Sequence, residues 1–292
     1  MRAKEQSITA EHNAALRAIE SLRPPGERIC FDPLARFFVP ARLAAAVASI
    51  DCGEKLIASW ESVVPGICTA ILARTGFIDA CLGEALEHGL DQVVILGAGF
   101  DTRALRFDAL QAGVPVFELD HPATQAVKIA RMRRVWPSLP DHLHFIPIRF
   151  EAENLAAKLL AHRYRPDGRT FFVWEGVTYY IGASAVDAVF EFIAGHCAAG
   201  SGVVFDYLPP AVIDGTCLQP EAVGLRDSLA MFGEALIFGI DPDRIDRFLA
   251  RRGLRTLRHL RSDQYPGAAT GGGCVGRRPS PLFFFVQAQV EG

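Results

Sequence analysis

The sequence predicts an α/β protein whose mostly parallel sheet is covered by helices on both faces. From residue 91 onward, short apolar runs rich in β-branched residues alternate with segments of helical periodicity, which is typical of βαβ units. The first run, Gln92 to Leu96, is followed by a glycine turn, a helical stretch and a second strand that ends on Asp120. That order of elements indicates the first half of a nucleotide-binding unit.

The first 90 residues contain helical patterns and no predicted strand. We expect a helix at 7–22, a helical stretch that begins at Asp32-Pro33, a helix at 55–73 interrupted near Pro65-Gly66, and a helix at 75–88 before Gly89. This region either packs against the core or forms a cap over a ligand, and the sequence favours neither.

The rest of the chain supplies the predicted sheet. Strands are expected at 92–96, 114–119, 144–148, 170–174, 202–206, 254–260 and 282–288, and helices at 102–110, 122–135, 155–162, 184–197, 222–236 and 242–252. A stretch with Pro209-Pro210 breaks the alternation and is expected to be an insertion that acts as a lid. We expect one domain, divided into a helical cap (1–90), a cofactor-binding core (91–206), a lid insertion (207–240) and the end of the core (241–292, with a glycine-rich loop at 267–278).

Composition narrows the function. The 292 residues carry a net charge of −3, whereas a general nucleic-acid binder would carry a basic excess. The seven cysteines include no C-x-x-C pair, so we expect free thiols in a reducing cytosol, no disulfide framework and no metal site. No run approaches the roughly 18 apolar residues of a membrane span, and no targeting segment is recognised. We therefore expect a cytoplasmic protein; nothing in the sequence indicates an oligomeric state.

The glycine turn indicates which nucleotide could bind. Gly97 and Gly99 would let the backbone approach a ligand, but a dinucleotide fingerprint needs a third glycine where this sequence has Thr102. Asp101 stands where a pyrophosphate would meet a helix N-terminus, and like charges would repel there. A cationic nucleotide without phosphate, S-adenosylmethionine, fits better. NAD in the crevice of an oxidoreductase is the alternative, as is a plain turn whose glycines serve only geometry.

Ligands of open α/β sheets bind outside the carboxyl ends of the strands. Polar residues are found at five such ends: Gly97, Gly99 and Asp101; Asp120 and His121; Arg149 and Glu151; Glu175; and Asp206. Glu175 directly follows an apolar strand and precedes Gly176, so its carboxylate could accept from an ammonium or a ribose hydroxyl. The alternative is that Glu175 caps the next helix.

Four blocks of sequence resemble a known family. They are Arg74-Thr75 with Ile78-Asp79, the stretch 92–103, the stretch 117–125 with Lys128, and the stretch 174–181. Together, in this order, they are similar to the leucine carboxyl methyltransferase family, above all to its bacterial S-adenosylmethionine-dependent methyltransferases. The resemblance extends from about residue 13 to 286 and implies a class I methyltransferase (Rossmann-like) fold with S-adenosyl-L-methionine as the cofactor.

The resemblance also implies roles for individual residues. Arg74 would pair with the carboxylate of the cofactor, Gly97 would let the main chain approach its methionine part, Asp120 would hold the ribose hydroxyls, and Glu175 would complete the pocket. The cofactor-binding set so predicted is Arg74, Gly97, Gly99, Asp101, Asp120, Phe150 and Glu175.

One position departs from the family. Arg149 precedes Phe150 where the family usually has an aspartate that contacts the exocyclic amine of adenine, and arginine has no acceptor for that amine. Glu151 or a main-chain carbonyl would have to substitute, or adenine binding would be weaker.

These observations predict an O-methyltransferase that acts on a carboxylate or hydroxyl of a small molecule, in preference to a protein C-terminus. The catalytic residues are not identified by the sequence: His121, His196, Tyr179 and Tyr180 are candidates only if the acceptor needs a base or faces these rings. A relative that kept the pocket but lost turnover is the non-enzymatic alternative, and Arg149 is the feature that favours it.

Overall fold

A seven-stranded sheet forms the centre of the molecule. In this computed structural model, which describes residues 8–266 and 277–291, the strand order is β3-β2-β1-β4-β5-β7-β6. The strands are β1 (Gln92–Leu96), β2 (Val116–Asp120), β3 (Leu143–Pro147), β4 (Thr170–Trp174), β5 (Gly202–Tyr207), β6 (Leu254–Arg261) and β7 (Phe284–Val290). β1 to β5 are parallel, and β7 lies antiparallel between β5 and β6. This is the predicted mostly parallel α/β sheet.

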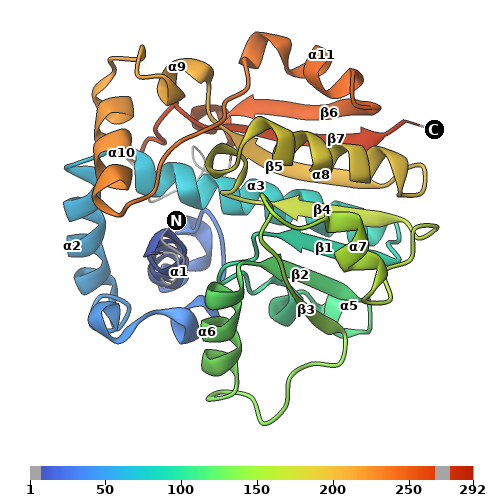
Figure 1. Cartoon of the computed structure of the whole chain (residues 1–292). Helices are drawn as coiled ribbons and strands as arrows, with labels where there is room; N and C mark the ends of the chain where they lie inside the picture. Colours follow the sequence, from blue (N-terminus) through green and yellow to red (C-terminus); the bar gives the residue numbers. More distant parts are fainter. Residues whose placement is uncertain (1–7, 267–276, 292) are drawn as a thin grey trace.

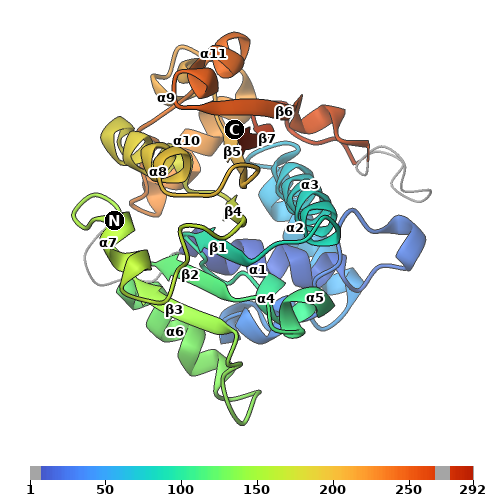
Figure 2. The ribbon, with the colours of Figure 1, turned by 90° about the vertical axis from the view of Figure 1, so that its right-hand side faces the viewer.

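Two apolar cores cover the two faces of the sheet. All five residues of β1 are buried, as are all five of β4, because successive side chains point to opposite faces. Val93 and Ile95 contribute to one core, and Val94 and Leu96 to the other. Figure 2 shows the covering helices, with α3 and α5 on one side of the sheet and α7 and α8 on the other. The continuous apolar run at 92–96 is thus explained by burial on both faces.

Among the described residues, three α-helices precede the first strand, and the remaining helices lie between successive strands. Before the sheet lie α1 (Ile8–Glu20), α2 (Ile50–Glu61) and α3 (Ile67–Glu87), with short 3-10 turns η1 (Pro25–Glu27), η2 (Ala35–Phe38) and η3 (Ala41–Leu43). Between the strands lie α4 (Arg103–Arg106), α5 (Asp108–Gln111), α6 (Pro122–Met132), α7 (Leu155–Leu160), η4 (Thr178–Tyr180), α8 (Ala183–Gly195), α9 (Pro210–Ile213), α10 (Pro220–Met231), η5 (Pro242–Arg244), α11 (Ile245–Ala250) and η6 (Ser262–Gln264).

The N-terminal helix α1 lies at the edge of the sheet where the parallel strands end, beside α2, α6 and α10 (Figure 1). Its Ala10 faces the glycine turn after β1, since a Cβ atom on Gly99 would lie 3.3 Å from the Cβ of Ala10. The long helix α3 instead packs on the sheet beside β4, β5 and β7. None of the helices in the described ranges is both long and apolar enough to cross a bilayer.

Two expectations for the N-terminal region are wrong. The stretch after Asp32-Pro33 forms only the single turn η2, because the carboxylate of Asp32 accepts from Ala35 N while Arg17 holds it from the other side. The break at Pro65-Gly66 is confirmed, and Gly66 adopts a positive φ of 74°. Beyond it, however, α3 runs without interruption from Ile67 to Glu87, so Arg74 lies within a helix.

Two of the later helices differ from their patterns in ways that the backbone explains. The expected helix at 102–110 is two single turns, since Phe107 between α4 and α5 is extended with φ −92° and ψ 115°. The helix expected to reach Leu236 ends at Met231, because Gly233 takes a left-handed φ of 70°. The glycine-rich loop predicted at 267–278 lies almost entirely outside the described residues.

Candidate active site

All seven residues predicted to bind a cofactor line one cavity at the carboxyl ends of the parallel strands. The cavity has a volume of about 430 Å³, which is within the range of small-molecule sites. It receives Arg74 from α3, the turn 97–101 after β1, Asp120 at the end of β2, Phe150 after β3 and Glu175 after β4. Residues of α1 and of the stretch after α10 complete its wall. The prediction that these strand ends share one hollow is confirmed.

The glycine turn has a tightly constrained backbone. Gly97 and Gly99 have positive φ values of 67° and 49°, which L side chains rarely adopt. A Cβ atom on Gly97 would overlap the side chain of Val177. The amides of Gly97 and Ala98 donate to the carbonyl of Leu119, at 2.8 and 3.1 Å, and the amide of Gly99 donates to Asp120 Oδ2. These three amides are therefore engaged within the protein and do not form a cradle for a diphosphate.

Asp120 ends β2 and faces the cavity. Its carboxylate accepts the amide of Gly99 at one oxygen and the amide of His121 at the other. Burial raises the pKa of Asp120 to about 6, although the two amides and Lys128 act in the opposite direction. The backbone amides thus fix the carboxylate in place, and burial moves its pKa upward to about 6.

Glu175 is held by cations and not by a helix N-terminus. Arg74 Nε donates to its Oε1 at 3.1 Å, as does the hydroxyl of Thr75, and Arg103 Nη1 lies 2.8 Å from its Oε2. Burial alone would raise the pKa of Glu175, but Arg103 and Arg74 outweigh it and hold that pKa well below its ordinary value. Glu175 therefore stays ionised, and the alternative of helix capping is excluded by these contacts.

Asp206, at the end of β5, holds the guanidinium of Arg74 in place. Arg74 Nη1 donates to Asp206 Oδ2 and to the hydroxyl of Tyr179, both at 3.0 Å. The other oxygen of Asp206 accepts the amide of Gly176 at 2.6 Å. Burial raises the pKa of Asp206 in spite of its neighbour Arg74. These bonds use Nε and Nη1 of Arg74 and leave out its Nη2.

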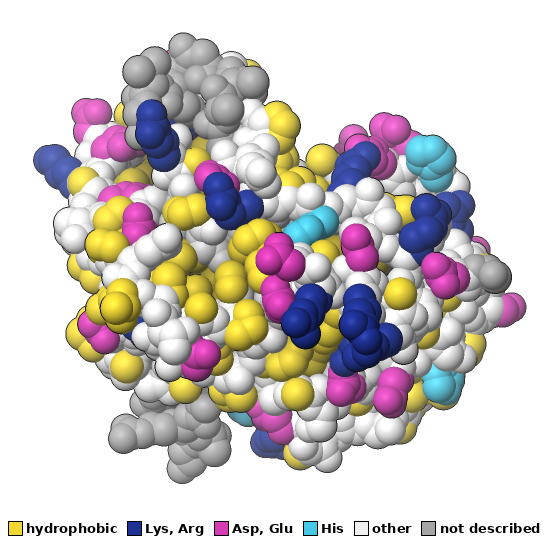
Figure 3. Space-filling view, turned by 90° about the horizontal axis from the view of Figure 1, so that it is seen from above, with side chains coloured by type: hydrophobic (Ala, Val, Ile, Leu, Met, Phe, Trp, Pro, Cys, Tyr) yellow, Lys and Arg dark blue, Asp and Glu magenta, His cyan; other side chains and the backbone are white. Residues whose placement is uncertain are grey.

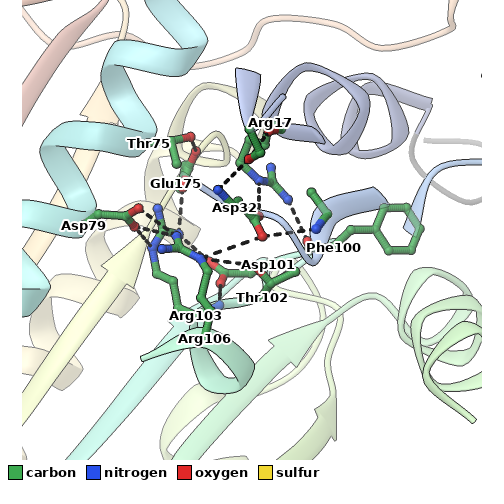
Figure 4. Close-up of polar contacts among 12 residues, drawn as sticks. Arg17, Asp32, Thr75, Asp79, Phe100, Asp101, Thr102, Arg103, Arg106 and Glu175 are labelled. Atoms are coloured by element: carbon green, nitrogen blue, oxygen red, sulfur yellow. Dashed lines mark hydrogen bonds and ion pairs between the residues drawn. The ribbon is translucent and has the colours of Figure 1, made fainter. Parts of the chain in front are cut away.

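A buried network of charges, which the sequence did not reveal, supports this site (Figure 4). Arg103 Nε and Arg106 Nη2 both donate to Asp79 of α3 at 2.7 Å. On the side of α1, Arg17 pairs with Asp32 at 2.8 Å and donates to the carbonyl of Phe100 at 2.7 Å. The network ties α1, α3 and the glycine turn together at the candidate site.

Asp101 belongs to this network more than to the cavity. Its two carboxylate oxygens accept the backbone amide and the guanidinium of Arg103. Asp101 still lines the cavity, but arginines offset its charge and that of Glu175. The sequence showed the acidic residues at this edge and Arg74, and it missed Arg17, Arg103 and Arg106, because periodicity does not show which charged side chains pack together.

A second buried pair lies beside Asp120. Lys128 of α6 approaches Glu118 Oε2 to 2.6 Å, and both side chains are only 1% exposed. Burial raises the pKa of Glu118 to about 7; Lys128 lowers it, whereas Asp101 and Asp120 raise it. Glu118 and Asp120 lie two positions apart on β2 and so point to the same face, which makes Lys128 the neighbouring cation of both.

The residues that follow β3, an edge strand of the sheet, also line the cavity. Ile148, Arg149, Phe150 and Glu151 line it together, and the side chains of Arg149 and Glu151 are exposed. His121 lines the cavity as well, and burial followed by Arg149 lowers its pKa. His196, the other histidine candidate, stacks on Phe192 instead, with ring centroids 5.2 Å apart. His196 is therefore not a residue of this cavity.

Two polar atoms on the cavity wall are buried without a protein partner. They are Oδ1 of Asn13, on α1, and Oγ1 of Thr124, on α6. Buried polar groups normally have a hydrogen-bond partner, so both atoms are suited to a polar ligand. In the described part of the chain, no group of three or more His, Cys, Asp or Glu residues is placed to hold a metal ion.

The sequence also shows which family the fold and the site belong to. A sequence model described as leucine carboxyl methyltransferase matches residues 10–194. This chain belongs to that family. The predicted resemblance is thus confirmed, and the chain is a member of a family of methyltransferases.

Individual relatives agree with this assignment. A Bacillus subtilis protein named "Putative S-adenosyl-L-methionine-dependent methyltransferase YktD" is 31% identical over 192 residues, which are 66% of this chain and 63% of that protein, somewhat less than two thirds of its length. A Frankia alni protein with a name of the same form is 29% identical over 78% of this chain and 88% of its own.

A solved structure, titled as a putative methyltransferase from Thermobifida fusca, covers all of this chain and 97% of its own, with a TM-score of 0.59 at 14% identity. At that identity, the match supports the class I methyltransferase fold and nothing more specific.

Proposed function

We propose that this methyltransferase binds S-adenosyl-L-methionine in the cavity at the carboxyl ends of the strands and transfers its methyl group to an oxygen atom. The acceptor would be a carboxylate or a hydroxyl of a small molecule. One observation carries the cofactor assignment. The cavity presents a fixed carboxylate, Asp120, and a guanidinium, Arg74, while the amides of the turn between them are already paired. A ligand with ribose and carboxylate but no phosphate satisfies those groups.

The residues divide among the parts of such a ligand. Arg74 Nη2 would pair with the carboxylate, in a task suited to a guanidinium, and Asp120 would accept from the ribose hydroxyls. Gly97 and Gly99 leave room for the backbone to approach, and Phe150 would pack against adenine. Because the side chain of Arg149 has no hydrogen-bond acceptor, Glu151 or a main-chain carbonyl would accept the hydrogen bond from the exocyclic amine of adenine.

Glu175 and Asp101 would act on the ligand through the arginines they hold. Glu175 is engaged by Arg74 and Arg103, so its role would be to orient Arg74. The bound cofactor supplies a methyl group on a positively charged sulfur. The protein contributes alignment of the acceptor oxygen with that methyl group in a site shielded from water, which can supply several kcal/mol.

An NAD-dependent oxidoreductase is disfavoured by the same turn. Its amides donate to Leu119 and Asp120, whereas a dinucleotide site would need them for the pyrophosphate. A relative without turnover would still bind the cofactor, and only an activity measurement separates it from the enzyme.

The proposal is tested by calorimetry on wild type, Asp120→Ala and the exposed Asp108→Ala. We expect wild type and Asp108→Ala to bind S-adenosylmethionine and S-adenosylhomocysteine alike, and Asp120→Ala to bind both at least about tenfold more weakly, since a charged hydrogen bond contributes about 1.5–3 kcal/mol. NADH should not bind. The cofactor assignment would be wrong if NADH bound in preference to the adenosyl compounds, or if Asp120→Ala left the affinity for the adenosyl compounds unchanged.

A further inference from the structure

Thr124 of α6 presents a buried hydroxyl that has no role in the proposed function. The residue lines the cavity and is only 1% exposed, and its Oγ1 has no hydrogen-bond partner among the described residues. A polar atom on an outer face is hydrated by solvent, as on the face in Figure 3, where acidic and basic side chains stand beside hydrophobic ones. Thr124 lacks that solvent, and buried hydroxyls normally have a partner. Its hydroxyl therefore indicates a polar ligand in the cavity.

Bonds to the local backbone do not explain this hydroxyl. A threonine within a helix commonly donates to the carbonyl three or four residues earlier. Here the carbonyl of Asp120 accepts the amide of Ile148 at 2.8 Å. The carbonyl of His121 accepts the amide of Gln125 at 3.1 Å. Both carbonyls thus have a donor already, and neither bonds to Thr124.

The packing of α6 on β2 places Thr124 beside Asp120. α6 begins just after β2 ends, and Lys128, one turn beyond Thr124, reaches back to within 2.6 Å of Glu118. Four residues of a helix and two residues of a strand both span about 6–7 Å. The same step along both elements leads from this ion pair to Thr124 and Asp120. Both of these residues line the cavity, so the hydroxyl and the carboxylate face one region of it.

A second unpartnered atom faces this region from α1. Oδ1 of Asn13 is buried with no hydrogen bond to the described residues, and Asn13 lines the cavity. One turn later, Arg17 donates to the carbonyl of Phe100 at 2.7 Å, so this face of α1 lies against the glycine turn. In that turn, the amide of Gly99 donates to Asp120. Polar atoms from α1, α6 and β2 thus surround one region of the cavity.

The groups in this region complement a diol. An ionised carboxylate such as Asp120 only accepts hydrogen bonds, so it binds the hydrogens of ribose hydroxyls and leaves their lone pairs unused. A threonine hydroxyl can donate to such a lone pair. The ammonium group of the cofactor offers no acceptor for that hydrogen, and its carboxylate is assigned to Arg74. The ribose is therefore the part of the ligand that suits Thr124.

We propose that Thr124 completes the ribose site by donating a hydrogen bond to a hydroxyl that Asp120 holds from the other side. The inference rests on the proposed function and adds a specificity-determining residue to it. A deoxyribose ligand that lacks this hydroxyl would leave Thr124 unpaired in the complex. The protein would therefore discriminate against such a ligand.

Calorimetry with S-adenosylhomocysteine tests the side chain. Thr124→Val keeps the shape and removes the hydroxyl, and we expect it to weaken binding about fivefold, which corresponds to one neutral hydrogen bond. Thr124→Ser keeps the hydroxyl and should stay within about twofold of wild type. Thr256→Val is the matched control, because Oγ1 of Thr256 on β6 is also buried without a partner in the described residues but lies outside the cavity. It should bind the ligand as wild type does.

Deoxy ligands identify the group that Thr124 binds. The 2′-deoxy and 3′-deoxy forms of S-adenosylhomocysteine each lack one hydroxyl. With the form that lacks the partner of Thr124, Thr124→Val should bind within about twofold of wild type, because the bond is already absent. With the other form, the loss in Thr124→Val should remain about fivefold. A loss of the same size with all three ligands would overturn the proposal.

Unfolding in urea separates binding from a structural role. Exchange of an unpartnered buried hydroxyl for a methyl group of the same shape is nearly neutral or stabilising. The urea midpoints of ligand-free Thr124→Val and Thr256→Val should therefore equal or exceed that of wild type. A lower midpoint of Thr124→Val would mean that its hydroxyl already has a partner within the protein, and it would overturn the proposal.

Wild type and Asp120→Ala show which of the two proposals fails. If wild type does not bind S-adenosylhomocysteine, the proposed function is wrong, and this inference is wrong with it. If Asp120→Ala weakens binding while Thr124→Val binds as wild type does, the cofactor assignment stands and Thr124 is not part of the ribose site.

Discussion

Replacing Gly97 by alanine should destabilise the protein through two separable effects. The first is the left-handed φ of 67°, which costs an L residue about 1–2 kcal/mol. The second is steric, since the new Cβ would overlap Cγ2 of Val177 and lie 3.4 Å from its Cβ, and forced repacking of this kind costs about 1–3 kcal/mol. The expected loss in the free energy of unfolding is therefore about 3 kcal/mol.

Gly89 offers a matched control for the first effect. Its φ is 81°, and a Cβ atom there would meet nothing within 4 Å, so Gly89→Ala should cost only about 1–2 kcal/mol. Val177→Ala provides the control for the second effect. Combined with Gly97→Ala, it should recover part of the steric cost and give a coupling free energy of about 1–2 kcal/mol.

Urea denaturation of wild type, the three single variants and the Gly97→Ala/Val177→Ala double variant measures these differences in the free energy of unfolding. Calorimetry with S-adenosylhomocysteine measures the effect of each change on ligand affinity. Gly97→Ala should weaken that binding, and Val177→Ala should partly restore it. A Gly97→Ala protein as stable as Gly89→Ala, or a coupling near zero, would show that Val177 does not restrict this position and would refute the reasoning.

Three further predictions concern charged groups. Affinity for S-adenosylhomocysteine should fall as the pH drops below about 6, since Asp120, with its pKa raised to about 6 by burial, then gains a proton and loses the charge that accepts the ribose hydroxyls; affinity that is flat from pH 7 to 5 by calorimetry would contradict this. Lys128→Met should cost about 3 kcal/mol by leaving Glu118 unpaired, and Glu118→Leu added to it should restore most of that loss in urea denaturation. Arg17→Met should cost less, about 2 kcal/mol, because the buried Asp32 then keeps only the more distant cation Arg106, 3.9 Å away. Proteolysis should then cleave α1 faster, whereas unchanged cleavage would mean that Arg17 does not anchor this helix.

The parallel core was the part of the fold that the sequence predicted best. β1 and β4 have the predicted bounds, 92–96 and 170–174, because each is an apolar run buried on both faces and bordered by polar residues. The convergence of Arg74, Asp120 and Glu175 on one cavity was also predictable. The ends of parallel strands meet at one edge of a sheet, and the resemblance supplied Arg74. Their binding of a cofactor stays a prediction.

The charge network was beyond local pattern. Asp32 was interpreted as a helix start, but Arg17 from another helix holds its carboxylate. Asp101 was predicted to face the cofactor, yet Arg103, two residues later, occupies both of its oxygens. The Arg17–Asp32 pair depends on which segments pack together, and no periodicity in the sequence records that.

A crystal structure of the complex with S-adenosylhomocysteine would test the central claim most directly. The account predicts ribose hydroxyls within hydrogen-bond distance of Asp120, the amino-acid carboxylate on Arg74 and adenine against Phe150. Density for the ligand outside this cavity, or an adenosyl group turned so that Asp120 meets no hydroxyl, would contradict it.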